Sequence, residues 1–516
     1  MTPDTALNPA PEPEIQTPLT TGMTTKVVKG SIWTLIGQAA PFTVTFVTTP
    51  FVIRFLGPES YGVLILIGLI PSYFLFGDFG MGVASTRFAS EAFGRGDRKR
   101  EAEIVWTAAA VAALSLLLVA VPLIVFSGEI VAQLGVPEDM REIASIGLKF
   151  TSVAFFVTAL SLVINSPMLA RLRMDLNAST QALSRIVLAV ATPFILCFGF
   201  GIVAIAAWSL VVALIGITAV FLFSSRLLPE FLRPRFNREH LRPLLTFGAS
   251  WFIASIAAIL LVNLEKLFLS RMVSVQGLAF YSVAFTFANM AMLFSAAMSQ
   301  ALLPAFSQMQ TPENNAFYRT LFARGIRLNI IWLLPALTVM FVVARLFFTL
   351  WAGEDFGRES TLPFYILLAG LLFNIIAHVP HAAITAAGRT DVVARLYWIE
   401  LAIYAIVAYI LINNFGIVGA AAAWSLRAVL DAFIIVRLAG KYAHVGLGEQ
   451  TDLAKLGFCL LALIPAIVVA AINSYSLWLI AIVPAGLAVY AALIWRTFVD
   501  ADEKRWITEK YRKFAS

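Results

Sequence analysis

Several charged residues lie inside long apolar stretches of this chain, where a charge needs a partner or a water-filled cavity. A charged side chain at the centre of a bilayer costs about 2.5–3.5 kcal/mol on insertion scales. A carboxylate in such a place can hold a proton or close a gate, and an arginine can bind a phosphate through its planar fork. The residues in question are Asp78, Arg185, Glu265, Lys266, Glu400, Arg427 and Asp431.

The spacing of three of these residues allows a structural and a functional interpretation. Asp78 lies about nine residues, or roughly 13 Å of helix, before Arg87 at the predicted end of its span. It belongs either to a packing network or to a transport cavity. Arg427 and Asp431 share a helix face at i,i+4 spacing. They form either a self-neutralising pair or a cavity site in which Arg427 meets a phosphate.

The other buried charges have similar alternatives. Glu265 and Lys266 are adjacent, so their side chains point about 100° apart and do not simply pair. Lys266 and Arg185 either extend towards an interface or line a cavity. Glu400 needs a partner or a proton. His378 and His381 have no third ligand nearby, so we predict no metal site.

Composition places these residues in a membrane protein. Of the 516 residues, 60% are hydrophobic and 13% charged, whereas an average soluble domain is roughly 25% charged. The net charge of +7 is typical of basic cytoplasmic loops, and without a nucleic-acid-binding motif we expect no nucleic acid partner. Cys197 and Cys459 form no disulfide or metal pattern.

Apolar segments of about 20 residues predict an all-α integral membrane protein with about fourteen transmembrane helices. The predicted spans are 31–53, 61–84, 104–126, 146–169, 181–199, 202–224, 245–268, 279–303, 328–350, 361–386, 393–412, 416–437, 454–473 and 476–496. Two prolines, Pro41 and Pro50, interrupt the first span. They are either fixed bends or hinges, since each removes a backbone N–H and tends to kink its helix.

The distribution of Lys and Arg indicates the orientation. Basic residues concentrate in segments 87–100, 226–242 and 496–513, on the side of the N-terminus. The opposite side is left with Arg54, Arg141, Lys149, Arg271, Arg345 and Arg358. The positive-inside rule then predicts that both termini are cytoplasmic.

The chain repeats itself internally. Trp208 and Trp424 are 216 positions apart, as are Arg173 and Arg389. Six spans in each half give both halves the same direction, which predicts a pseudo-two-fold axis along the membrane normal. The predicted parts are a disordered cytoplasmic tail (1–25), the two halves (26–226 and 244–440), a basic linker (227–243), two extra helices (454–496) and a basic cytoplasmic tail (497–516). Met1 and Met23 are the two candidate start residues for translation.

The order of several motifs resembles a known family. Lys29-Gly-Ser-x-Trp33 leads into the first span, Arg54-Phe-Leu-Gly-Pro-Glu-Ser-Tyr-Gly62 follows it, and Gly77-Asp-Phe-Gly-Met-Gly82 comes next. This order resembles the polysaccharide transporters of the multidrug/oligosaccharidyl-lipid/polysaccharide exporter superfamily, which include the bacterial O-antigen flippases. The resemblance covers about residues 26–440. Glu265 departs from it, because Asp is expected there more often.

The resemblance implies a transporter rather than an enzyme. The implied substrate is a polyprenyl-pyrophosphate-linked oligosaccharide, which is an O-antigen or exopolysaccharide repeat unit. The transporter would move it by alternating access from the inner to the outer leaflet of the bacterial inner (cytoplasmic) membrane. Arg427 and Arg185 are then candidates for binding the pyrophosphate, with Arg54 and Arg271 at the outer exit. No cofactor is expected, and the sequence has no P-loop; proton or sodium coupling and the substrate gradient stay open. Membrane lipids and other polysaccharide-assembly proteins are expected partners.

Three other functions remain as alternatives. A lipid-linked peptidoglycan-precursor flippase shares the superfamily and the fourteen spans. A cation-coupled multidrug exporter shares the fold, but such exporters resemble twelve-span proteins. A membrane polysaccharide polymerase or ligase usually has one large outer loop with catalytic residues, whereas the longest outer loop predicted here is about 127–145.

Overall fold

The computed structural model describes residues 20–292, 295–296, 298–299, 302, 306, 315–446, 457–459, 461–472 and 478–498. Every regular element within these residues is a helix. Most of both predicted tails, residues 1–19 and 499–516, lies outside the described residues.

The helices fall into two halves and a C-terminal pair. The N-terminal half consists of α1 (Thr20–Ser72), η1 (Leu75–Asp78), α2 (Met81–Gly94), α3 (Arg98–Val125), α4 (Ser127–Gln133), η2 (Glu138–Met140), α5 (Arg141–Ile164), α6 (Ser166–Ala170), α7 (Met174–Cys197) and α8 (Ile202–Leu227). Two short 3-10 turns, η3 (Pro229–Leu232) and η4 (Arg238–His240), lead to the C-terminal half. That half consists of α9 (Leu241–Met272), α10 (Val275–Met290), α12 (Asn315–Ala352), α13 (Glu354–Glu359), α14 (Thr361–Ala386) and α15 (Thr390–Tyr442). The C-terminal pair is α17 (Ile464–Ile472) and α18 (Leu479–Thr497).

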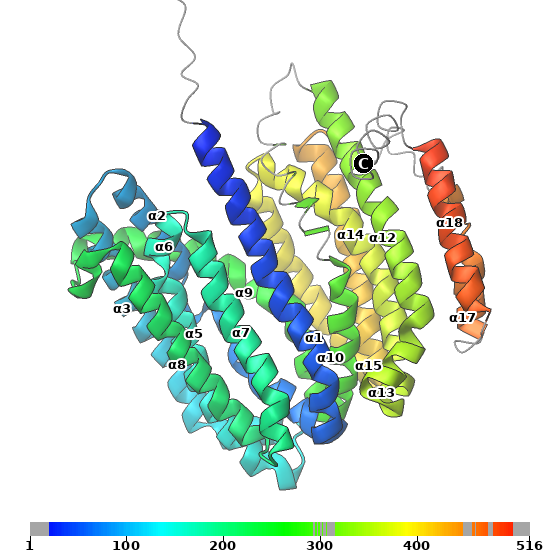
Figure 1. Ribbon diagram of the computed structural model, residues 1–516, viewed down its shortest axis with the longest axis horizontal. Helices are drawn as coiled ribbons and strands as arrows, with labels where there is room; N and C mark the ends of the chain where they lie inside the picture. Colours follow the sequence, from blue (N-terminus) through cyan, green and yellow to red (C-terminus); the bar gives the residue numbers. More distant parts are fainter. Residues whose placement is uncertain are drawn as a thin grey trace, which may run out of the picture.

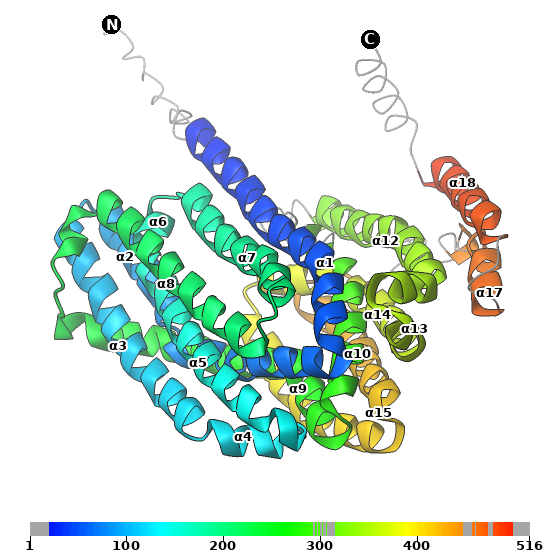
Figure 2. The same cartoon turned by 60° about the horizontal axis from the view of Figure 1, so that its bottom comes forward.

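The two halves stand side by side, with α1 and α9 running between them (Figures 1 and 2). Within the N-terminal half α5 packs on α8 and α1 on α7, and within the C-terminal half α14 packs on α15. Large clusters of buried apolar side chains fill each half, and a further cluster joins the halves through Val275 and Leu278 of α10. The pair α17 and α18 lies at the outer edge of the C-terminal half, against α12 (Figure 1).

The helical, membrane-spanning character predicted from composition is confirmed. Among the described residues, nine helical stretches are long and apolar enough to cross a membrane on length and composition alone. Two of these stretches, Ala39–Gly94 and Thr390–Tyr442, run through a sharp break, and each covers most or all of two predicted spans. The total of fourteen therefore stays a prediction.

Two glycines produce breaks inside long helices. Gly57 in α1 has φ 75° and ψ 165°, and Gly416 in α15 has φ 56° and ψ −128°. A positive φ is strained for most residues but costs glycine little, so the chain reverses direction at these points. Pro58 follows Gly57 directly, and proline is well tolerated in the first turn of the next helix. The breaks agree with the predicted ends of the first and eleventh spans.

The second predicted span, 61–84, is not one helix, and this corrects the sequence prediction. The helix ends at Ser72, η1 follows, and α2 begins at Met81. Phe79 and Gly80 both have positive φ, 56° and 72°, which no α-helix accommodates. Asp78 therefore ends η1, at the break before α2, and does not lie inside an α-helix.

The basic linker 227–243 is packed rather than free. Phe231 is fully buried and stacks on Trp106 of α3, whose indole N–H donates to the Phe231 carbonyl at 2.8 Å. Asn237 donates from Nδ2 to Glu103 Oε2 at 2.9 Å. These contacts fix the start of α9 against the N-terminal half.

The internal repeat is visible in local geometry. Arg173 forms an ion pair with Asp175 at 2.9 Å, and Arg389 forms one with Asp391 at 3.3 Å. The residue before each arginine has a positive φ, 55° at Leu172 and 73° at Gly388. The turn before α7 thus matches the turn before α15. The axis that relates the two whole halves stays a prediction.

Candidate functional site: two chemically different cavities

The N-terminal half contains two adjoining, partly open cavities of about 570 and 380 Å³. Helices α1, α5, α7 and α8 supply most of their lining. The two cavities share Thr151, Arg185 and Ser209, so they form one continuous site. We call this site the N-half cavity. Thr286 of α10 also lines it, so the site reaches the C-terminal half.

The polar lining of the N-half cavity consists mainly of hydroxyl groups. Thr151 donates to the Ile67 carbonyl at 2.8 Å, and Ser209 donates to the Ala206 carbonyl at 2.6 Å. Because each hydroxyl has one proton and two acceptor lone pairs, these groups retain acceptor capacity towards a ligand. Hydroxyls of the same lining belong to Thr45, Thr48, Thr49, Tyr61, Thr158, Ser161, Thr180, Ser184 and Thr192.

Arg185 is the charged residue of this lining. No Asp, Glu or Lys lines either cavity within the described residues, and no acidic group of the described chain pairs with Arg185. Because α7 begins at Met174 rather than near residue 181, Arg185 lies about 16 Å from the helix start. The guanidinium therefore faces the cavity as an uncompensated positive charge among neutral acceptors.

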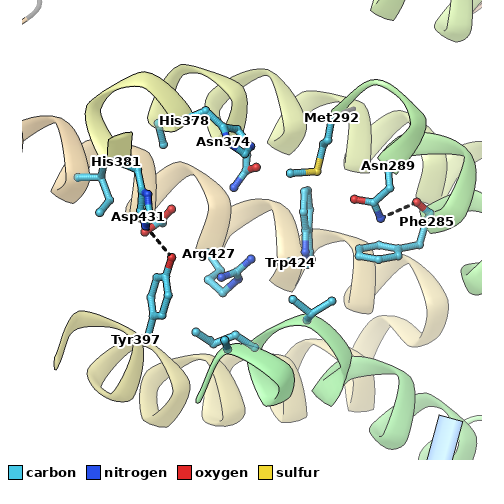
Figure 3. Close-up of a pocket in the computed structure, with 15 residues that line it drawn as sticks. Phe285, Asn289, Met292, Asn374, His378, His381, Tyr397, Trp424, Arg427 and Asp431 are labelled. Atoms are coloured by element: carbon cyan, nitrogen blue, oxygen red, sulfur yellow. Dashed lines mark hydrogen bonds between the residues drawn. The ribbon is translucent and has the colours of Figure 1, made fainter. Parts of the chain in front are cut away.

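The C-terminal half contains a second cavity of about 310 Å³ between α9, α10, α14 and α15. We call it the C-half pocket. Figure 3 shows Trp424 and Arg427 on α15 at its centre, with Asn374 and His378 of α14 on one side. Asp431 and His381 lie at one end, where the Tyr397 hydroxyl hydrogen-bonds to His381 Nε2 at 3.3 Å (Figure 3).

Arg427 is already surrounded by acidic groups. Its Nη1 lies 3.9 Å from Glu400 Oε2, across the two limbs of α15. The carboxyl groups of Glu400 and Asp431 are also neighbours, so Arg427 has two acidic groups near it. Within the described residues, the ion pair of Arg427 at 4.0 Å or less is with Glu400. The pair with Asp431, which was one of the two interpretations of the i,i+4 spacing, is not formed at that distance.

Glu265 and Lys266 point in different directions, as their adjacency predicted. The Glu265 side chain is fully buried and accepts hydrogen bonds from Tyr404 at 2.9 Å and Tyr281 at 3.2 Å. Lys266 Nζ donates to Asn263 Oδ1 at 2.9 Å and lies 4.5 Å from the centroid of the Phe285 ring. Both charges are held inside the C-terminal half, so Lys266 does not extend to an interface.

Asp78 has a local structural role. Its Oδ1 accepts from the Gly80 N–H at 2.9 Å and its Oδ2 from the Gly82 N–H at 2.8 Å. The carboxylate therefore satisfies free N–H groups at the start of α2, where negative charge also complements the helix dipole. It lines neither of the two sites described above.

The two arginines predicted at the outer exit occupy corresponding places near helix ends. Arg54 lies just before the Gly57 break, and its Nη2 donates to the Leu350 carbonyl of α12 at 2.9 Å. It therefore joins the two halves. Arg271 lies in the last turn of α9 and is exposed.

The predicted hinges at Pro41 and Pro50 are not where α1 breaks. The helix continues through both prolines, and its non-helical residue is Gly57. Proline lacks one backbone N–H, but in a long helix the remaining hydrogen bonds can hold its direction. The break of α1 therefore lies at Gly57, and the hinge role of Pro41 and Pro50 stays a prediction.

Comparison with known proteins identifies the family. Residues 51–359, more than half of the chain, match the model of a family described as polysaccharide biosynthesis protein. The chain belongs to this family of polysaccharide biosynthesis proteins.

Two relatives of this polysaccharide biosynthesis protein have informative names. A Shigella flexneri protein named as an O-antigen transporter is 23% identical over 409 residues, which cover 79% of this chain and 96% of that protein. The succinoglycan biosynthesis transport protein ExoT of Rhizobium meliloti is 25% identical over 279 residues, which cover 54% of this chain and 53% of ExoT.

Solved structures show the fold. The lipid II flippase MurJ in an inward closed conformation superposes with a TM-score of 0.69 at 14% identity, covering 92% of this chain and 99% of MurJ. An inward-facing multidrug resistance transporter of the MATE family and MOP superfamily gives a TM-score of 0.64 at 14% identity, with 80% and 98% covered. The polysaccharide biosynthesis protein therefore has the transporter fold of this superfamily.

Sequence reasoning missed the hydroxyl lining and the tyrosine partners of Glu265. One signal for the lining was present, because Thr45, Thr48 and Thr49 recur at i, i+3 and i+4 on one helix face. Tyr404 carried no such signal, since it lies 139 positions from Glu265.

Proposed function

We propose that this protein is a flippase that moves a polyprenyl-pyrophosphate-linked oligosaccharide from the inner to the outer leaflet by alternating access. The family, the transporter fold and the names of the relatives support this class of function. The substrate would be an O-antigen or exopolysaccharide repeat unit, and the protein would act as a transporter without catalytic residues.

The observation that carries the proposal is the chemistry of the N-half cavity. A lipid-linked sugar brings an anionic pyrophosphate beside uncharged hydroxyl groups. The cavity offers one arginine without a lining carboxylate, among hydroxyls with acceptor capacity. Arg185 would bind the pyrophosphate bidentately, because the guanidinium fork matches phosphate oxygens.

Arg427 is the weaker candidate for the same task. A pyrophosphate beside Arg427 would also meet Glu400 and Asp431, and like charges at such distances repel. The proposal therefore assigns the phosphate to Arg185 and leaves Arg427 within its acidic surroundings.

The cellular setting follows from the same function. We place the protein in the bacterial inner membrane with both termini cytoplasmic, because the basic residues concentrate on that side. Outer-leaflet delivery would hand the glycan to other polysaccharide-assembly proteins. A proton or sodium gradient, or the substrate gradient itself, would supply the energy.

A lipid-linked peptidoglycan precursor is the second candidate substrate. The fold likeness to a lipid II flippase favours it, and its polyprenyl pyrophosphate would suit the same cavity. Restored growth of cells depleted of their own lipid II flippase would select this candidate, whereas restored surface glycan in a glycan-flippase deletion would select the first.

The experiment that tests the proposal is a charge series at Arg185 in cells that report surface glycan. Arg185→Gln should reduce export strongly, and lipid-linked glycan should accumulate on the inner leaflet. Arg185→Lys should retain part of the export, because it keeps the charge but loses the fork. Arg437→Gln, an exposed arginine of α15 that lines neither cavity, is the matched control. Normal export by Arg185→Gln at equal protein level would refute the assignment.

A further inference from the structure

The C-half pocket contains buried polar atoms that lack partners. Asn374 Oδ1, Arg427 Nε and Asp431 Oδ1 are buried without a hydrogen-bond partner, and all three residues line the pocket. Behind them, both oxygens of Glu400 lack a donor, and this side chain is only 8% exposed. An unpaired buried polar atom destabilises the folded state, and native proteins keep few of them. Their convergence on one cavity indicates a ligand that supplies the missing bonds.

The types of these atoms define the ligand. Among these unpaired atoms, the oxygens of Asn374, Asp431 and Glu400 are acceptors, and the donor is Arg427 Nε. A complementary ligand therefore donates more hydrogen bonds than it accepts, as a group of hydroxyls does. The neighbouring carboxyl groups of Glu400 and Asp431 also disfavour a negatively charged ligand, because its charge would lie close to two acidic groups.

The walls of the pocket suit the faces of a sugar ring. Trp424, Phe285 and Tyr397 line it, and Trp424 and Phe285 meet edge to face at 5.7 Å. A pyranose has C–H groups on its faces and hydroxyls around its rim. Aromatic walls with a few convergent polar groups are typical of small-molecule sites. The volume of about 310 Å³ lies at the lower end of the usual 300–1,000 Å³, enough for a single ring.

We propose that the C-half pocket binds one pyranose ring that has no carboxylate, either uncharged or carrying an amino group. Resting on the proposed function, this ring belongs to the same lipid-linked glycan whose pyrophosphate lies at Arg185. Helix α10 lies between the two sites, because its Thr286 lines the N-half cavity while its Phe285 and Asn289 line the pocket. The pocket thereby selects the glycan, and the N-half cavity selects the lipid phosphate.

The proposal is tested by saturation-transfer NMR on the purified full chain in detergent with three free sugars. The protein carries Arg185→Gln, so that the N-half cavity offers no cation to a carboxylate. Glucose and glucosamine should receive saturation from this protein, and glucuronate should receive none. Asn374→Leu, which keeps the volume but removes the acceptor, should weaken the binding of both sugars by about five- to tenfold. Asp431→Asn removes one carboxyl and should allow glucuronate to bind. Arg437→Gln, at an exposed residue that lines neither site, should leave all three results unchanged.

Three outcomes would overturn the proposal. The first is equal saturation-transfer signals from all three sugars, and the second is sugar signals that Asn374→Leu does not change. The third is the absence of any sugar signal together with a thermal stabilisation by sodium that Asp431→Asn abolishes. The last result would make the pocket a cation site. Thermal unfolding of each variant shows that it is folded. Because free sugars are measured without translocation, this experiment fails independently of the charge series at Arg185.

Discussion

Removal of the Tyr404 hydroxyl tests whether Glu265 is held as an ionised group inside the C-terminal half. Glu265 is fully buried and has two tyrosine donors, Tyr404 at 2.9 Å and Tyr281 at 3.2 Å. Tyr404→Phe removes the shorter bond and changes almost nothing else in the packing. The variant should therefore report the strength of one hydrogen bond to one carboxyl group.

The magnitude depends on the charge of Glu265. A hydrogen bond to a charged group contributes about 1.5–3 kcal/mol, and one between neutral groups about 0.5–1.5 kcal/mol. For a unit of 150–250 residues, such as the C-terminal half, 1 kcal/mol corresponds to about 2–4 °C in melting temperature. We expect Tyr404→Phe to lower the melting temperature by at least 3 °C if the carboxyl is ionised.

A double-mutant cycle isolates the pair. Glu265→Gln gives a neutral side chain of the same shape, so Tyr404→Phe in that background should cost about 1 kcal/mol or less. Tyr409→Phe, an exposed tyrosine on the same helix, is the control and should leave the melting temperature unchanged. The assay is thermal unfolding of purified protein in detergent. Equal losses from Tyr404→Phe in both backgrounds would refute an ionised Glu265.

Three further predictions concern other parts of the chain. Reporter fusions at residues 135 and 355 should read periplasmic and those at 235 and 445 cytoplasmic, and the reverse pattern would overturn the topology. Asp78→Ala should destabilise the protein by about 0.5–2 kcal/mol in thermal unfolding, because α2 loses its cap, and Asp78→Asn should destabilise it less. A variant that unfolds normally but fails in export would instead favour a cavity role for Asp78. The Arg54→Glu, Arg271→Glu double variant should stall lipid-linked glycan on the inner leaflet while the corresponding lysine variant exports, and normal surface glycan from the glutamate variant would exclude both arginines from the exit.

The spans were predictable where apolar length alone decides the structure. The span predicted at 361–386 coincides with α14, because nothing in that segment competes with a membrane helix. The break around Asp78 was not predicted, although the segment is just as apolar. Its cause is local, a positive φ at Phe79 and Gly80 with a carboxylate that bonds the next N–H groups. A hydropathy window averages over such features.

The buried charges were also predictable, but their partners were not. A charge in an apolar segment is visible in the sequence, so Glu265, Glu400 and Arg427 stood out. Whether each charge is compensated depends on residues far along the chain, such as Tyr404 for Glu265. Arg185 and Arg427 look alike in sequence, yet one faces neutral hydroxyls and the other a glutamate at 3.9 Å. Tertiary packing alone separates them.

This difference between the halves is the strongest reason to give the two cavities different tasks. The 216-residue offset pairs Glu400 with Ser184, Arg427 with Val211, and Asp431 with Ile215. Ser184 lines the N-half cavity, so an uncharged hydroxyl stands there where the C-terminal half has a carboxyl. A repeat that needed these charges for folding would carry them in both halves, because the same helices pack in each. The charges of the C-half pocket therefore serve a task that the N-half cavity does not have. In the division proposed here, that task is the binding of the sugar, while the N-half cavity binds the phosphate.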